Sequence, residues 1–349
     1  MAVCAVRMVR RAAIASPLIA LSVLQAGAAF AAQSAVVLLY HRFGESAHPS
    51  TSVTIEQFEA HLQELRDGKY VVRPLTEIAA AMRAGRALPD NTLGISIDDA
   101  FSSVYHEAWP RLRRANIPFT LFVATDAVDR GTTGYMSWSQ IRELAENGVT
   151  IGSQTASHPH MPLLTPERNA AELEKSSARF RAELGIAPTL IAYPYGEYSL
   201  AVGAVAKAAG FAAGFGQHSG VIHPGSNLFN LPRFAFNESY GDLDRFRLAG
   251  RALPLQASDV TPADPFLAGT TNPPLFGFTV QDLAPERLSR LACYVSGQGK
   301  ARIERLGERR IEVRMAEAFR PGRTRVNCTL PASGGRWRWF GRQFVVPPR

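Results

Sequence analysis

The chain has 349 residues and a formal net charge of +8, from 38 Lys and Arg against 30 Asp and Glu. That length is too great for one average domain, and no stretch beyond the N-terminal segment is long and apolar enough to cross a bilayer. Residues 277–349 carry 15 basic and 6 acidic residues, whereas residues 32–276 carry 20 basic and 24 acidic. Because these arginines are scattered through a β-like alternation, we expect an anionic envelope polymer or a solvated face beside them, and no nucleic acid.

Residues 1–31 are typical of a secretory signal peptide. Three arginines precede a mostly apolar run of residues 12–28, and Ala29-Phe30-Ala31 fits the small-x-small cleavage rule. The alternative is an uncleaved anchor, although the apolar run is short for a membrane span. We expect a periplasmic or secreted protein that meets the membrane only through this segment during export.

Short apolar runs alternate with amphipathic segments between Ala35 and Gly250. The runs that resemble strands are Ala35–Tyr40, Thr92–Ile97, Phe119–Val123, Val149–Ser153, Thr189–Tyr193, Ala212–Phe215 and Asn230–Phe234. This alternation predicts parallel strands with outer helices, and seven repeats in a segment of this length suit a barrel.

Two adjacent acids, Asp98 and Asp99, follow the strand predicted for Thr92–Ile97. The carboxyl ends of parallel strands are where α/β barrels carry their chemistry. Neighbouring residues at a strand end diverge, so one acid could bind a metal while the other accepts a proton. The alternative is that one of them caps the following helix, but the downstream motifs favour a functional pair.

Two further motifs follow in order, Gly152-Ser153-Gln154-Thr155-Ala156-Ser157-His158-Pro159-His160 and Ala192-Tyr193-Pro194-Tyr195-Gly196. Together with Ser96-Ile97-Asp98-Asp99-Ala100, they resemble the three motifs of polysaccharide deacetylases, carbohydrate esterase family 4, also called the NodB homology domain. The resemblance covers roughly residues 35–250. It implies a distorted (β/α) barrel, commonly of seven strands, and hydrolysis of an acetyl amide with a divalent metal ion, often zinc.

The resemblance also implies roles for individual residues. Asp98 matches the general base, Asp99 the metal-binding acid and His158 the second metal-binding histidine. The first metal-binding histidine falls on Gln154, whose amide oxygen is a poorer zinc ligand than imidazole. His160 shares a face with His158 on an extended segment and could substitute; the alternative is a histidine that packs on the surface.

Other positions match the family less sharply. Pro194, Tyr195 and Gly196 match a segment that lines the substrate groove, and they would also suit a tight turn. His41, after the first strand, could line the pocket or be a structural, hydrogen-bonded histidine. Arg233 could orient Asp98 or form an ion pair without catalytic meaning. The family's general acid has no evident counterpart.

The C-terminal part of the chain has a different composition. Residues 251–276 are rich in Pro, Thr and Asp and are interpreted as an ordered linker. Residues 277–349 contain alternating segments typical of a small β-sandwich, with expected strands at Ala301–Arg305, Arg310–Arg314, Arg323–Leu330 and Trp337–Val346. Cys293 and Cys328 remain after signal cleavage, which in an oxidising compartment favours a disulfide over two free thiols.

The sequence thus predicts a signal peptide (1–31), a NodB-like domain (32–250), a linker (251–276) and a β-rich accessory domain (277–349). The expected function is metal-dependent hydrolysis of N-acetyl, or else O-acetyl, groups on an envelope or extracellular polysaccharide. This is a reaction of hydrolases that act on carbon–nitrogen bonds other than peptide bonds. The alternative is a non-catalytic carbohydrate-binding protein on a deacetylase scaffold, with Gln154 marking a lost metal site. The sequence does not indicate the oligomeric state.

Overall fold

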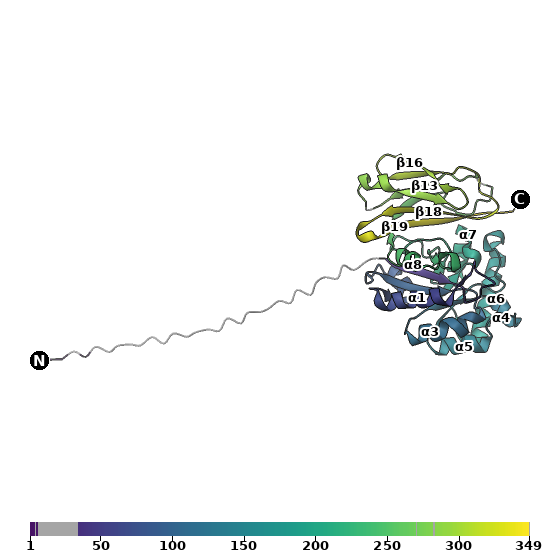
Figure 1. The fold of residues 1–349 in the computed structure, drawn as a ribbon, viewed down its shortest axis with the longest axis horizontal. Helices are drawn as coiled ribbons and strands as arrows, with labels where there is room; N and C mark the ends of the chain where they lie inside the picture. Colours follow the sequence, from purple (N-terminus) through teal and green to yellow (C-terminus); the bar gives the residue numbers. More distant parts are fainter. Residues whose placement is uncertain (4, 6–33, 270, 282, 349) are drawn as a thin grey trace.

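The computed structural model of the protein describes residues 1–3, 5, 34–269, 271–281 and 283–348. The predicted signal peptide lies almost wholly outside these residues. An α/β domain and a β-rich domain pack side by side, with strands β18 and β19 of the second domain running along the first (Figure 1). Among the described residues, no helix has the length and apolar character needed to cross a bilayer.

The α/β domain is built on a parallel sheet with the strand order β10-β1-β5-β6-β7-β8-β9, and β4 also pairs with β5. These strands are β1 Val36–Tyr40, β4 Val71–Val72, β5 Thr92–Ile97, β6 Thr120–Val123, β7 Thr150–Ser153, β8 Leu190–Ala192, β9 Ala213–Phe215 and β10 Phe234–Ala235. A parallel bridge between Phe215 and Leu231 brings the two ends of the sheet together. The distorted seven-strand barrel expected from the sequence is confirmed.

One expected strand is displaced in the structure. The run Asn230–Phe234 was predicted to be a strand, but β10 begins only at Phe234. Pro232 lies in the middle of the run and has no backbone N–H to donate to a sheet ladder. The residues before β10 instead make irregular contacts that close the barrel, including a hydrogen bond from the Gly216 N–H to the Leu231 carbonyl at 2.9 Å.

Helices follow most of the strands and cover the outside of the sheet (Figure 1). They are α1 Ile55–Asp67, α2 Leu75–Arg83, α3 Trp109–Arg114, α4 Thr125–Asp129, α5 Trp138–Glu146, α6 Pro166–Leu184, α7 Leu200–Ala208 and α8 Leu243–Gly250. Local sequence explains their ends. Thr54 and Gln57 form a reciprocal capping box at the start of α1. Helix α6 starts after the capping residue Thr165 with a proline and ends at Gly185, which has a φ of 67°.

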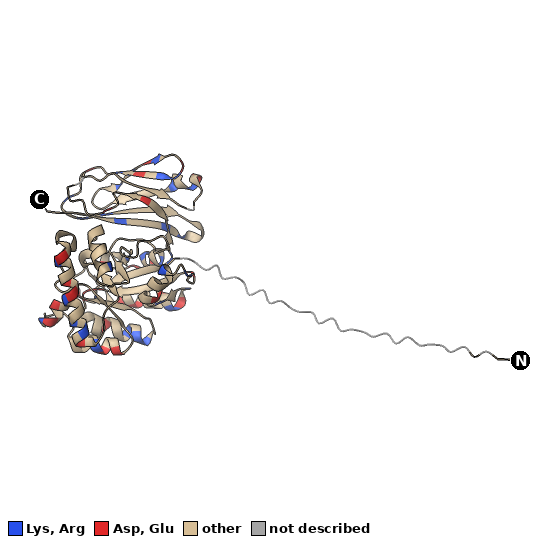
Figure 2. Ribbon diagram, turned by 180° about the vertical axis from the view of Figure 1, so that it is seen from behind, with Lys and Arg blue, Asp and Glu red and all other residues tan. Residues whose placement is uncertain are grey.

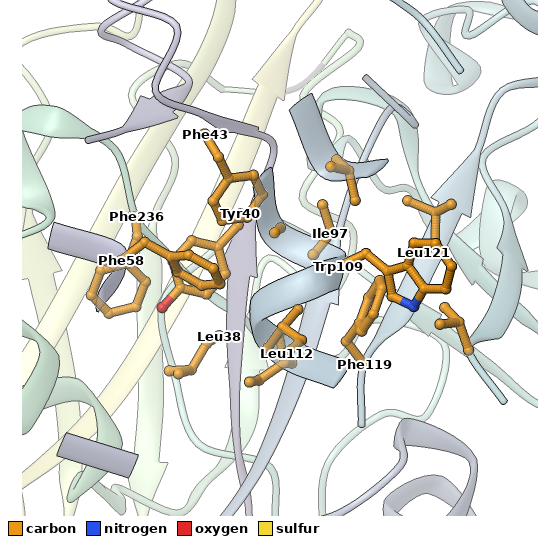
Figure 3. Close-up of a cluster of buried hydrophobic side chains, with 14 of the residues drawn as sticks. Leu38, Tyr40, Phe43, Phe58, Ile97, Trp109, Leu112, Phe119, Leu121 and Phe236 are labelled. Carbon is orange, nitrogen blue, oxygen red and sulfur yellow. The ribbon is translucent and has the colours of Figure 1, made fainter. Parts of the chain in front are cut away.

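A large apolar core lies between the sheet and the helices. Figure 3 shows Tyr40, Phe43, Phe58 and Phe236 gathered on one side of β1, and Trp109, Leu112 and Phe119 packed near Ile97 and Leu121. Every residue of β1 and β5 is buried. Continuous burial of this kind is typical of parallel strands covered on both faces. It holds the ends of β1 and β5 rigidly, and the Asp98-Asp99 pair follows one of those ends.

The C-terminal domain is a sandwich of two sheets, with the orders β11-β19-β18-β14-β15 and β12-β13-β17-β16. The strands are β11 Leu253–Pro254, β12 Ala257–Thr261, β13 Phe276–Val280, β14 Ala292–Val295, β15 Gly299–Lys300, β16 Arg302–Leu306, β17 Arg310–Arg314, β18 Gly322–Pro331 and β19 Trp337–Val346. Cys293 and Cys328 are cross-strand partners on β14 and β18 and form a disulfide. The predicted cysteine pairing is therefore present in the folded chain.

The segment predicted as a linker also contributes to the sandwich. Within residues 251–276, β11 pairs with β19 and β12 pairs with β13. Its Pro-rich composition favours a prediction of loop. Prolines are nevertheless tolerated at the ends and edges of strands, so the composition did not exclude these strands. The segment therefore does more than connect the two domains.

The two domains differ in charge. In Figure 2, basic and acidic residues alternate over the helices of the α/β domain, whereas Lys and Arg predominate over Asp and Glu in the sandwich. The seam between the domains contains specific contacts. Trp339 packs edge-on against Phe234, with ring centroids 5.2 Å apart, and Arg336 pairs with Asp90 at 3.2 Å.

Candidate active site

Three loops at the carboxyl ends of β5, β7 and β8 carry most of the predicted site residues, whereas His41 follows β1 and Arg233 precedes β10. Asp99, Thr155, His158 and Tyr195 have positive φ values of 72°, 68°, 58° and 59°, although none of them is a glycine. Such conformations are uncommon for residues with a Cβ and cluster at functional sites, where the surrounding structure holds them. All three motif loops therefore contain backbone that is fixed by its environment.

Asp98 is completely buried and forms a two-pronged ion pair with Arg233. The Arg233 Nη1 and Nη2 atoms donate to the two carboxylate oxygens at 2.7 and 2.8 Å, and both side chains have 0% exposure. Arg233 also donates to the Ser96 hydroxyl at 3.2 Å and to the Gly216 carbonyl at 2.8 Å. A buried ion pair is tolerated when its remaining polar atoms are satisfied, and these bonds fix the orientation of Asp98.

Asp99 and His158 come from different loops and face one another. The His158 Nε2 lies 3.5 Å from the Asp99 Oδ1. Burial lowers the pKa of His158 below its usual value, while the Asp99 and Asp98 carboxylates oppose this shift. The neighbouring His41 adds to the lowering, which places His41 near the pair, directly after β1. A neutral imidazole nitrogen beside a carboxylate oxygen is a donor combination that binds divalent metals.

Gln154 is buried beneath this pair. Its Oε1 accepts a hydrogen bond from the Asp99 backbone N–H at 3.1 Å, which assigns the other end of the amide as the nitrogen. The Nε2 is buried and has no hydrogen-bond partner among the residues that the structure describes. Unpaired buried amide groups are rare and each needs an explanation. Gln154 therefore supports the backbone of Asp99 and leaves one polar group unsatisfied inside the site.

His160 makes contacts that differ from those expected of a substitute metal ligand. Its Nδ1 lies 2.8 Å from the Oε2 of Glu197, and its ring stacks on Tyr195 at a centroid distance of 4.3 Å. The His158 ring meets the edge of the same tyrosine at 4.6 Å. In the part of the chain that the structure describes, no group of three or more His, Cys, Asp or Glu side chains is arranged to hold a metal. The structure thus does not bring His160 to the Asp99–His158 pair, because Glu197 and Tyr195 hold it.

The turn Pro194–Gly196 is a short 3-10 element after β8. Pro194 and Gly196 are buried, and Tyr195 lies against both His158 and His160. Glu197, Arg323 and Gln343 also belong to this region, although sequence reasoning did not single them out. Glu197 directly follows the third motif, so its position could have identified it. Arg323 and Gln343 lie in the sandwich, where no local pattern marks them.

Comparison with known proteins identifies relatives of the α/β domain. The family model "Polysaccharide deacetylase" matches residues 85–214. The chain is 25% identical over 197 residues to the putative polysaccharide deacetylase YxkH of Bacillus subtilis, covering 56% of this chain and 69% of that protein. It is 26% identical over 201 residues to the poly-beta-1,6-N-acetyl-D-glucosamine N-deacetylase of Staphylococcus aureus, covering 54% of this chain and 68% of that one. The chain carries a polysaccharide deacetylase domain.

The fold of this deacetylase domain has solved counterparts. The structure of IcaB from Ammonifex degensii superposes with a TM-score of 0.57 and 25% identity, over 63% of this chain and 98% of that one. The deacetylase PplD of Streptococcus pyogenes superposes with a TM-score of 0.55 and 22% identity, over 59% and 94% of the two chains. The family match covers all three motifs but ends before Arg233 and the sandwich. Arg323 and Gln343 therefore lie outside the region that the family model matches.

The donor atoms in the deacetylase domain fit a divalent metal through two side chains. Two ligands about 2.1 Å from one tetrahedral metal lie roughly 3.4 Å apart, which is close to the 3.5 Å between His158 Nε2 and Asp99 Oδ1. Gln154 already uses one lone pair of its oxygen on the Asp99 N–H. Asp99 and His158 would therefore hold the ion, and an imidazole at the third position is missing.

Proposed function

We propose that the protein is an exported hydrolase that removes N-acetyl groups from an envelope or extracellular polysaccharide. A polymer of β-1,6-linked N-acetylglucosamine is the first substrate to test, because a relative named as the N-deacetylase of this polymer aligns with this chain over 201 residues. The observation that carries the proposal is the Asp99–His158 pair beside an acid, Asp98, that Arg233 fixes in place. The predicted signal peptide supports export.

The residues of the site divide the work of amide hydrolysis. A divalent ion held by Asp99 and His158 would supply Lewis-acid chemistry for the acetyl carbonyl and the attacking water. Asp98 accepts the proton of that water. Each Asp98 oxygen receives one bond from Arg233 and keeps a second lone pair for this purpose. Because Arg233 holds the carboxylate at both oxygens, Asp98 cannot rotate away from the reacting water.

Tyr195 forms the wall of the site next to the histidines. Its ring touches His158 edge-on and covers one face of His160. A fixed aromatic wall excludes water from one side of the acetyl group and gives an apolar surface for a sugar ring. We expect the N-acetyl group to lie between Tyr195 and the Asp99–His158 pair.

Acetate release tests the proposal. Purified protein would be incubated with a synthetic β-1,6-linked N-acetylglucosamine oligomer and, in parallel, with an O-acetylated xylan, each with and without added Zn²⁺, Co²⁺ or Ni²⁺. We expect acetate and free amines from the first substrate in the presence of metal, and none from the folded Asp98→Asn variant. Binding of the oligomer without acetate release from either substrate would instead support the carbohydrate-binding alternative, which the unsatisfied Gln154 amide favours.

A further inference from the structure

Two side chains of the sandwich reach across the seam to the active-site turn. Arg323 on β18 donates from Nη1 to the Tyr195 carbonyl at 3.0 Å. Gln343 on β19 donates from Nε2 to the Tyr195 and Gly196 carbonyls at 3.2 and 2.8 Å. Neighbouring strands therefore direct three hydrogen bonds to two consecutive carbonyls. Gln343 is buried at 5% exposure, so its bonds are shielded from competing water.

These carbonyls belong to a turn whose backbone conformation needs support. Tyr195 and Gly196 have φ values of 59° and 67°, so two consecutive residues adopt the left-handed region. A left-handed conformation is unfavourable for a residue with a Cβ, because the Cβ comes too close to the following carbonyl oxygen. The turn's own bonds are the Gly196 N–H to the Tyr193 carbonyl at 2.8 Å and the Glu197 N–H to the Pro194 carbonyl at 3.1 Å. The donors of Arg323 and Gln343 fix the opposite sides of the same peptide planes.

Arg323 also connects the sandwich to the histidines through side chains. Its guanidinium carbon lies 5.4 Å from the centre of the Tyr195 ring, and its Nε lies 3.8 Å from the Glu197 carboxylate. That carboxylate is 3% exposed and also holds His160 at 2.8 Å. Arg323 therefore contacts both the ring that touches His158 and the buried acid that holds His160.

We propose that the sandwich is a positioning part of the active site, with Arg323 and Gln343 as positioning residues that hold Tyr195 in its place beside His158. The inference rests on the proposed function for its kinetic consequence, but the contact itself can be tested without activity. The proposal gives the C-terminal domain a role. Arg323 and Gln343, which lie about 130 and 150 positions after Tyr195, support the wall of the barrel that faces the substrate.

The seam offers a matched control. At its other end Arg336, also on the sandwich side, donates from Nε to the Arg251 carbonyl at 2.7 Å and pairs with Asp90 at 3.2 Å. Asp90 precedes β5, whereas the site follows its carboxyl end. Arg336→Ala therefore removes an interdomain contact without touching the active-site turn.

The experiment compares wild type, Arg323→Ala/Gln343→Ala, Arg336→Ala and Arg323→Lys. Amide hydrogen exchange is measured on peptides that cover residues 193–199, and kcat and KM are measured with the oligomer. We expect faster exchange at Gly196 and Glu197 in the double variant only. A displaced catalytic wall should lower kcat/KM about 10- to 100-fold, mainly through kcat, and Arg323→Lys should restore part of it by keeping the charge beside Glu197.

The outcomes separate the proposals. Exchange and kinetics equal to wild type in the double variant would overturn the positioning role. A loss in Arg336→Ala as large as in the double variant would also overturn it, because the effect would then come from general loosening of the seam. If wild type releases no acetate but the exchange difference appears, the structural contact stands and the proposed function fails instead.

Discussion

Replacing Gln154 with histidine tests the metal site most directly. The Gln154 side chain is fully buried beneath Asp99, with its Nε2 unpartnered and its Oε1 on the Asp99 N–H at 3.1 Å. Gln154→His adds an imidazole to the two donors that lie 3.5 Å apart. Imidazole suits zinc better than an amide oxygen does, and we expect zinc affinity to rise at least tenfold, which corresponds to about 1.4 kcal/mol.

Gln154→His should also lower the stability of the folded protein. The Asp99 N–H loses its acceptor, and an unsatisfied buried donor costs about 1–3 kcal/mol of folding stability. The apo variant should therefore unfold at a lower temperature than wild type, while saturating zinc should raise its melting temperature by more than it raises that of wild type.

Competitive zinc titration against a chelator measures the zinc affinity. Thermal unfolding with and without zinc measures how much zinc binding stabilises each variant. Gln154→Leu is the control, because it removes the same hydrogen bond without adding a ligand. Since His160 is held by Glu197 and Tyr195, His160→Ala should leave zinc affinity unchanged in both backgrounds. Equal zinc affinity in Gln154→His and Gln154→Leu would refute the argument that position 154 faces the metal.

Three further outcomes are expected. Asp99→Ala should abolish metal binding, whereas Asp98→Asn should keep the metal and lose about 100-fold or more in turnover; metal analysis and acetate release on the same samples decide this. Replacing Cys293 and Cys328 with serine should lower the free energy of unfolding by about 4 kcal/mol in the chain-entropy model, for a sequence separation of 35, as denaturant titration would show. Burial lowers the pKa of His61 from 6.5 to about 4, so the unfolded chain takes up a proton first as pH falls. The free energy of unfolding should therefore drop by about 3 kcal/mol between pH 6.5 and 4 because of His61. If the free energy of unfolding of wild type changed with pH no more than that of His61→Gln, this expectation would be wrong.

The barrel strands were predictable from sequence where burial alone determines them. β1, β5 and β6 are short apolar runs covered on both faces, and their expected bounds agree with the structure to within a residue. The approach to β10 was not predictable in this way, because Pro232 breaks the ladder within an apolar run. β11 and β12 were missed for the opposite reason, since a Pro-rich composition indicates loops even where short strands complete a neighbouring sheet.

The site was predictable only where its residues lie in contiguous motifs. Asp98, Asp99 and His158 can be recognised in the sequence, because each lies shortly after a buried apolar strand. Arg323 and Gln343 reach the site only when the two domains pack together. In the sequence, an arginine on a strand of alternating polar and apolar residues looks the same whether it faces solvent or another domain. Sequence reasoning thus finds candidate groups within the first domain, Arg233 included, but not the side chains that the second domain contributes.

The buried Asp98–Arg233 pair shows why the holding groups matter. Removing one member of a fully buried pair leaves an uncompensated charge and typically costs about 3–5 kcal/mol, a large share of the stability of an ordinary domain. A barrel that needed only a packed core could replace both side chains with apolar ones at little cost. Arg233 instead donates hydrogen bonds to Asp98, to the Ser96 hydroxyl and to the Gly216 carbonyl. The complete burial of Arg233 against Asp98 is therefore explained by the orientation it imposes on that carboxylate.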